Sequence, residues 1–168
     1  MSPRAIHGSG LLLCIASSLI AIYYMEGYLG LEPCPLCVLD RIVIAAMAVL
    51  FLLAWLINPR RGGQVFFALL LMILGLLGVA LAGRHIWLQS LDRENLPDCT
   101  PALSYMVENF PLLETLSIVL NSSGQCAEVA WRFLSLGIPQ QTLIFFIVLL
   151  VHVLLILFYR RRPAPTRL

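Results

Sequence analysis

Charged residues are scarce in this 168-residue sequence, and lysine is absent from it. Only 12% of the residues are charged, whereas 60% are hydrophobic and the mean hydropathy is strongly positive. A soluble domain of this length could not cover its surface with so few polar side chains. The composition therefore excludes an ordinary soluble domain and predicts an integral membrane protein.

The hydrophobic residues are concentrated in four segments, at about residues 8–29, 37–57, 64–82 and 141–159. Roughly 20 helical residues cross the ~30 Å hydrocarbon core of a bilayer, so each segment is long enough to span it. The first is too long for the apolar part of a signal peptide, and we expect it to be retained. We predict an all-α integral membrane protein, a single domain over residues 1–168 with a four-transmembrane-helix bundle.

The arginines orient these four segments, because all eleven basic residues are arginine. If the chain crosses the membrane four times, seven arginines lie on one side of it: Arg4, Arg60, Arg61, Arg160, Arg161, Arg162 and Arg167. The nine acidic residues lie elsewhere. Arginine-rich short flanks are typical of the cytoplasmic face. We therefore expect both termini in the cytoplasm. This anchoring also explains the basic C-terminal tail better than nucleic-acid binding does.

A long loop, at about residues 88–139, then faces the other compartment. It contains two sets of apolar residues with helical spacing, separated by Pro111: Leu103, Met106, Val107 and Phe110, followed by Leu112, Leu113, Leu116, Val119 and Leu120. This pattern predicts short amphipathic helices, either on the membrane surface or on the tops of the spans. Residues 127–134 are also expected to be helical.

Four of the five cysteines, Cys34, Cys37, Cys99 and Cys126, fall on this non-cytoplasmic side. Thiols in an oxidising compartment rarely all stay reduced, so the four predict two pairs. Cys14 lies in the middle of the first segment, where we expect a buried thiol at a helix contact.

The sequence Cys34-Pro-Leu-Cys37 is typical of a reversible redox pair. Cys37 lies at the predicted start of the second helix, where the helix dipole favours a thiolate. Arg41 lies four residues later on the same face and could stabilise a thiolate or an anionic acceptor. The alternative is a zinc half-site, but Cys99 and Cys126 are too far apart in sequence to form the second half.

Cys99 and Cys126 permit two interpretations. A disulfide closing this loop would stabilise it by roughly 3–4 kcal/mol, which favours a structural role. Their neighbours are rich in proline, serine and glycine, which favours an exposed and labile disulfide instead. The residues alone leave both interpretations open.

The motif "EPCPLCVLDR", the four spans, Cys99 after a proline turn and "SSGQCAEVAWRFLSLGIPQ" around Cys126 together resemble the DsbB family over essentially the whole chain. Proteins of this family are bacterial inner-membrane enzymes that reoxidise the periplasmic thiol oxidase DsbA and pass the electrons to quinone. The resemblance implies the same function here, with ubiquinone or menaquinone as acceptor, a DsbA-like thioredoxin-fold partner and no metal.

The resemblance also implies roles for individual residues. Cys34 and Cys37 would form the quinone-coupled disulfide, with Arg41 supporting the quinone. Cys99 would be the sulfur attacked by DsbA and Cys126 its disulfide partner, which favours exchange over a structural role. Apart from the resemblance, the position of His85 near the outer end of the third span makes it a weaker candidate for a quinone contact, and the alternative is an interfacial anchor. Glu26 is expected at the interface, in water.

Two other classes of protein are compatible with parts of the pattern. An enzyme of the vitamin K epoxide reductase type has four helices and similar chemistry, but its quinone-proximal cysteine pair lies near the last span, after the loop pair. A membrane metal-binding or scaffold protein would need no redox cycle. Absorbance with quinone and metal content distinguish these classes from a thiol:quinone oxidoreductase.

Overall fold

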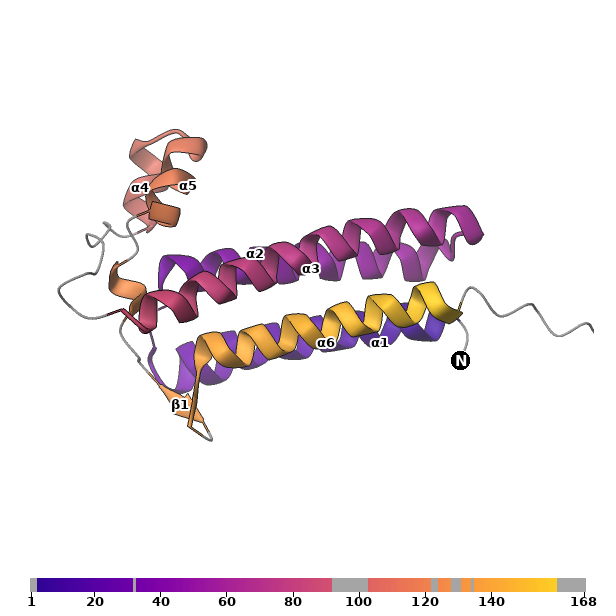
Figure 1. Cartoon of the computed structure of the whole chain (residues 1–168), viewed down its shortest axis with the longest axis horizontal. Helices are drawn as coiled ribbons and strands as arrows, with labels where there is room; N and C mark the ends of the chain where they lie inside the picture. The colour runs from indigo at the N-terminus through magenta and orange to yellow at the C-terminus, as the bar shows by residue number, and fades with distance from the viewer. Residues whose placement is uncertain are drawn as a thin grey trace, which may run out of the picture.

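The computed structural model of the chain describes residues 3–31, 33–91, 103–121, 124–127, 131–133 and 135–159. Four long helical segments run side by side (Figure 1). They are α1 (Pro3–Leu19) continued by the π-helix η1 (Ile20–Tyr28), α2 (Pro35–Ile57), α3 (Arg61–Gln89) and α6 (Ile138–Tyr159). All four are long and apolar enough to cross a membrane, which confirms the predicted all-α, four-helix membrane fold.

The boundaries of α2 follow from local chemistry. Proline occupies the first position of the helix, where its missing N–H leaves no hydrogen bond unmade. At the other end Asn58 adopts a left-handed conformation, with φ of 46°, and its N–H bonds to the Ala54 carbonyl. This cap ends α2 just before the tight connection to α3, so α2 and α3 pack as antiparallel neighbours.

The third helix extends past residue 82, where its apolar run ends in the sequence, to Gln89. Its last two turns carry Arg84 and His85, and His85 is buried by neighbouring elements. A helix does not need apolar residues to continue, because its backbone hydrogen bonds are internal. The extra turns carry α3 into the region where the cysteines lie.

The bundle core includes a close contact between α3 and α6. Phe146 of α6 is completely buried, and its ring packs against the backbone of α3 at Gly78. Small residues allow transmembrane helices to approach closely, and dispersion contacts then hold them together. Large apolar side chains such as Phe66, Ile73 and Ile144 point outwards, as expected for a surface in contact with lipid.

We expect Gly78→Ala to destabilise the bundle by about 1–3 kcal/mol, because the added methyl group would overlap the Phe146 ring. Thermal unfolding in detergent measures this effect. Gly83→Ala is the matched control, since a methyl group there meets no atom within 4 Å among the residues that the structure describes. Equal melting temperatures for the two variants would contradict the packing argument.

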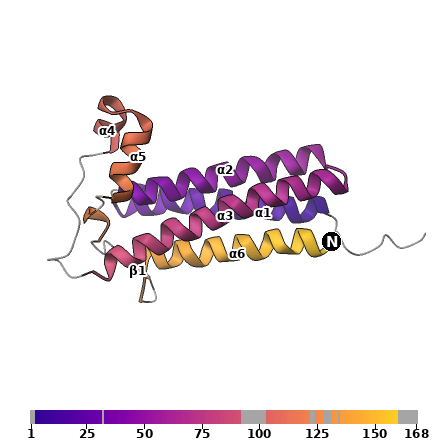
Figure 2. The same cartoon turned by 45° about the horizontal axis from the view of Figure 1, so that its top comes forward.

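The loop helices α4 (Leu103–Asn109) and α5 (Leu112–Asn121) stand beyond one end of the bundle (Figure 2). They meet at Pro111, as predicted, and the Thr115 hydroxyl donates to the Met106 carbonyl at 3.3 Å to hold them together. Met106 and Val119 are buried, whereas Leu113 is 83% exposed. The helices are therefore amphipathic, with α5 in contact with α2 and an apolar face uncovered.

A helix was predicted for residues 127–134, and the described residues of this segment depart from that prediction at Arg132 and Phe133, which form a strand. A short 3₁₀-helix, η3 (Gly124–Ala127), is followed by two antiparallel strands, β1 (Arg132–Phe133) and β2 (Leu136–Gly137). Ser135 has φ of 66°, which closes the tight turn between the strands. The helical prediction was wrong at these residues because the turn pairs the two strands, and this pairing outweighs the helical propensity of the sequence.

Candidate redox site

The site begins with Cys34 and Cys37 at the start of α2. Cys34 is the N-cap residue, with an extended backbone, and its Sγ accepts the Cys37 N–H at 3.4 Å. The two Sγ atoms lie 3.0 Å apart. One helical turn separates the residues, so the geometry of the helix start brings their sulfur atoms together. The pair is half-buried rather than exposed on a loop.

The short helix η3 places Cys126 beside this pair. Cys126 is buried, and its side chain interacts with the Cys34 thiol. This interaction, together with burial, raises the pKa of the Cys34 thiol to about 12, although the hydrogen bonds from Cys37 act in the opposite direction. Three sulfur atoms from two distant parts of the chain therefore meet at one end of the bundle.

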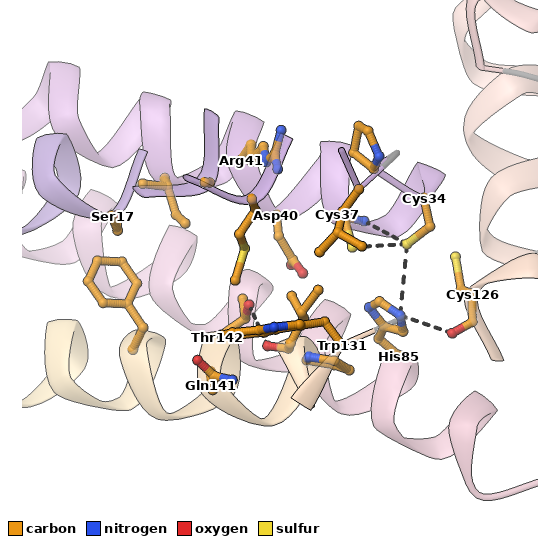
Figure 3. A pocket seen from close by; sticks show the side chains of 18 of the residues that line it. Ser17, Cys34, Cys37, Asp40, Arg41, His85, Cys126, Trp131, Gln141 and Thr142 are labelled. Carbon is orange, nitrogen blue, oxygen red and sulfur yellow. Dashed lines mark hydrogen bonds between the residues drawn. The ribbon is translucent and has the colours of Figure 1, made fainter. Parts of the chain in front are cut away.

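His85 of α3 connects these elements (Figure 3). The ring is 3% exposed, and its Nε2–H donates to the Cys126 carbonyl at 3.0 Å. The same nitrogen lies 3.8 Å from the Cys34 Sγ. The structure thus places His85 against the sulfur atoms, so the ring helps to hold η3 next to the cysteine pair.

A cavity of about 390 Å³ opens beside the three cysteines. This volume is within the range of small-molecule sites in proteins. Residues from all four spans and the loop line it, and half of them are apolar: Ile20, Ala21, Met25, Leu31, Pro33, Ile44, Trp131, Ile138, Pro139 and Phe145. The polar side chains of the lining include Asp40, Arg41 and His85. Such a mixed lining suits a flat, mainly apolar ring that carries polar atoms.

Arg41 lines this cavity, and its side chain forms an ion pair with Glu26 of η1. Both side chains are 29% exposed, so the pair is partly shielded from water. Glu26 is therefore not simply an interfacial residue in water, as the sequence suggested. The π-helix η1, nine residues long, carries Glu26 to Arg41 in the second turn of α2.

The sequence did not identify Asp40 as a site residue, although it follows Cys37 by three positions. Its side chain is 3% exposed and faces the cavity. Among the residues that the structure describes, no group hydrogen-bonds to its Oδ1 or to the Nδ1 of His85. The i, i+3 spacing, which puts Cys37 and Asp40 on one face of a helix, was the available signal.

Cys34, Cys37 and His85 also bring three donor atoms within 4.8 Å of one another, a spacing that a thiophilic metal ion could use. In this arrangement, however, Nε2 of His85 is the nitrogen nearest Cys34 and carries the proton donated to the Cys126 carbonyl. A metal at this position would require Nε2 to give up its proton and its hydrogen bond to the Cys126 carbonyl.

Two further cysteines complete the comparison with the sequence. Cys14 is completely buried in the bundle core, as predicted. Cys99 lies outside the described residues, so the predicted Cys99–Cys126 disulfide and its exchange with a partner stay predictions.

Comparison with known proteins is consistent with this site. The family model "Disulfide bond formation protein DsbB" matches residues 3–156. The chain is 45% identical to a disulfide bond formation protein B of Nitrosococcus oceani over 149 residues, 89% of this chain and 88% of that protein. It is 44% identical to the protein of the same name from Marinobacter nauticus over 163 residues, 97% of this chain and 96% of that protein.

Proposed function

The chain belongs to the DsbB family of disulfide bond formation proteins, and on this premise we propose that it reoxidises a DsbA-like thiol oxidase and passes the electrons to membrane quinone. The observation that carries the proposal is the meeting of Cys34, Cys37 and Cys126 beside an apolar cavity. A thiol-disulfide relay needs its sulfur atoms in contact, and a quinone needs an apolar site that it can reach from the bilayer.

The electrons would move through two disulfides in series. The reduced oxidase attacks Cys99, breaks the Cys99–Cys126 disulfide and leaves as a disulfide itself. The freed Cys126 thiolate then attacks Cys34, which breaks the Cys34–Cys37 bond and leaves Cys37 as a thiolate. Attack of Cys99 on Cys126 restores the loop disulfide and releases Cys34. The dithiol at residues 34 and 37 then carries the two electrons.

Quinone would accept these two electrons together with two protons and leave as quinol. Arg41 and His85 are the polar groups we assign to its ring, because both line the cavity next to the cysteine pair. The apolar lining would hold the ring and keep water from the sulfur atoms. Ubiquinone and menaquinone both fit this chemistry.

We place the cysteine end of the bundle on the periplasmic side of a bacterial inner membrane. Support comes from Arg4 and Arg60, which lie at the opposite end from the cysteines, where the N-terminus and the α2–α3 connection are found (Figure 1). Arginine near the ends of short connections favours the cytoplasm. Both termini would then be cytoplasmic, and the redox cysteines would face an oxidising compartment.

Anaerobic turnover tests the proposal directly. Purified protein is mixed with a reduced DsbA-like oxidase and with ubiquinone or menaquinone in turn, and quinone loss is followed by absorbance. We expect one quinol for each oxidase disulfide formed. Absence of quinone reduction, together with stoichiometric zinc and four reduced thiols in the purified protein, would instead support a metal-binding protein.

A further inference from the structure

Asp40 is a buried acidic residue inside a membrane-spanning helix. Its side chain is 3% exposed, and within the described part of the chain Oδ1 has no hydrogen-bond partner. Burying a carboxyl group without such a partner is unfavourable, because the group loses its hydrogen bonds to water. Ionisable residues in membrane spans are rare and commonly functional. The position therefore needs an explanation beyond packing.

Among the described residues, Asp40 forms no ion pair with an arginine. On its own helix, Cys37 lies one turn earlier, and the guanidinium of Arg41 is paired with Glu26 of η1. From α3 the ring of His85 interacts electrostatically with the carboxyl group. The remaining polar groups of the cavity come from α1, α3, α6, the N-cap of α2 and the loop: Ser17, Gln89, Gln141, Thr142, Cys34 and Cys126.

Oxidation of the cysteine pair requires a proton acceptor in this cavity. Two S–H bonds break, an S–S bond forms, and two electrons and two protons leave the sulfur atoms. The pKa of the Cys34 thiol lies well above its ordinary value, so this thiol does not ionise readily by itself. Glu26 is engaged by Arg41, whereas in the described part of the chain Asp40 has no ion pair and its Oδ1 has no hydrogen bond.

We propose that Asp40 is the proton-transfer residue of the site, taking protons from the Cys34–Cys37 dithiol one at a time and delivering them to the electron acceptor in the cavity. The inference rests on the proposed function, because it takes quinone as that acceptor. Each quinone oxygen gains one proton, so the two thiol protons and two electrons are all accounted for. Figure 3 shows Asp40 on the side of α2 that also carries Cys37.

Asp40→Asn is the test, because the amide has nearly the same size and cannot carry the proton. The first measurement is the rate at which a soluble quinone oxidises the reduced cysteine pair in a single turnover. We expect a decrease of about a hundredfold, typical of losing a general acid-base group, with little change in quinone affinity. The wild-type rate should depend on pH through Asp40, and the variant should lose that dependence.

The second measurement needs no quinone. The infrared difference spectrum between protein with a reduced and an oxidised Cys34–Cys37 pair should contain a carboxyl C=O band that shifts in D₂O. The band should be absent from Asp40→Asn and present in Glu114→Gln, a control at an exposed acid on α5. Asp40→Glu, which restores a carboxyl group, should recover part of the rate.

The two proposals fail in different ways. If wild-type protein reduces no quinone, the proposed function is wrong. If wild-type protein and Asp40→Asn oxidise the pair at equal rates, or if the infrared band persists in the variant, Asp40 is not the proton-transfer residue and the proposed function stands. A melting temperature close to that of the wild type verifies that the variant is folded.

Discussion

Cys126→Ser is expected to abolish electron transfer from a DsbA-like oxidase, with a loss of at least about a thousandfold in turnover, as for other residues that form covalent intermediates. Without this sulfur the loop has no disulfide to offer the partner. The variant also lacks the thiol that interacts with Cys34 in the wild type. Cys34 and Cys37 are untouched, so a small dithiol should still drive quinone reduction through them.

Stopped-flow absorbance of quinone with each electron donor in turn measures this separation. Cys14→Ser is the matched control, because it also removes one thiol but lies in the bundle core. It should retain activity with both donors. Turnover of Cys126→Ser with the protein donor above a tenth of the wild-type rate would contradict the relay.

Arg41→Ala is expected to raise the apparent KM for quinone about tenfold, which corresponds to ~1.4 kcal/mol of lost binding. The guanidinium lines the cavity and is the cation that we assign to the quinone ring. The substitution also leaves Glu26 without its partner. The two effects need separate variants, because only the first concerns quinone.

Glu26→Gln provides this separation, since it removes the ion pair and keeps the cation in the cavity. Initial rates over a range of quinone concentrations should show a smaller increase in KM than for Arg41→Ala. An equal increase in both variants would mean that Arg41 acts only by fastening η1 to α2. Unchanged quinone kinetics in Arg41→Ala would remove Arg41 from the site.

Much of the fold was predictable, because hydrophobic length and one-sided periodicity are local properties. The four spans, the break between α4 and α5 at Pro111 and the burial of Cys14 all follow from such patterns. The strands at residues 132–133 and 136–137 were missed. The pairing of two residues with two others depends on a single turn at Ser135. The helical spacing of apolar residues across the segment gave no sign of this turn.

The site was predictable in its residue types and less so in its contacts. Cys34 and Cys37 are three residues apart, so helix geometry alone brings their sulfur atoms together. Arg41 was expected near a thiolate or an acceptor, but the structure adds Glu26 as its ion-pair partner. That contact joins η1 to α2, and its geometry depends on the π-helical path of the chain through residues 20–28.

By itself the sequence determined that the protein has four membrane helices and a cysteine pair at the start of one of them. The positions of the arginines predicted its orientation in the membrane. These depend on hydrophobicity, charge and spacing along one segment. Only the tertiary structure decided that Cys126 and His85 reach Cys34, and that Asp40 faces the same cavity without a partner among the described residues. Those contacts join residues far apart in the chain, and they exist only because packing of α2, α3 and η3 brings their ends together.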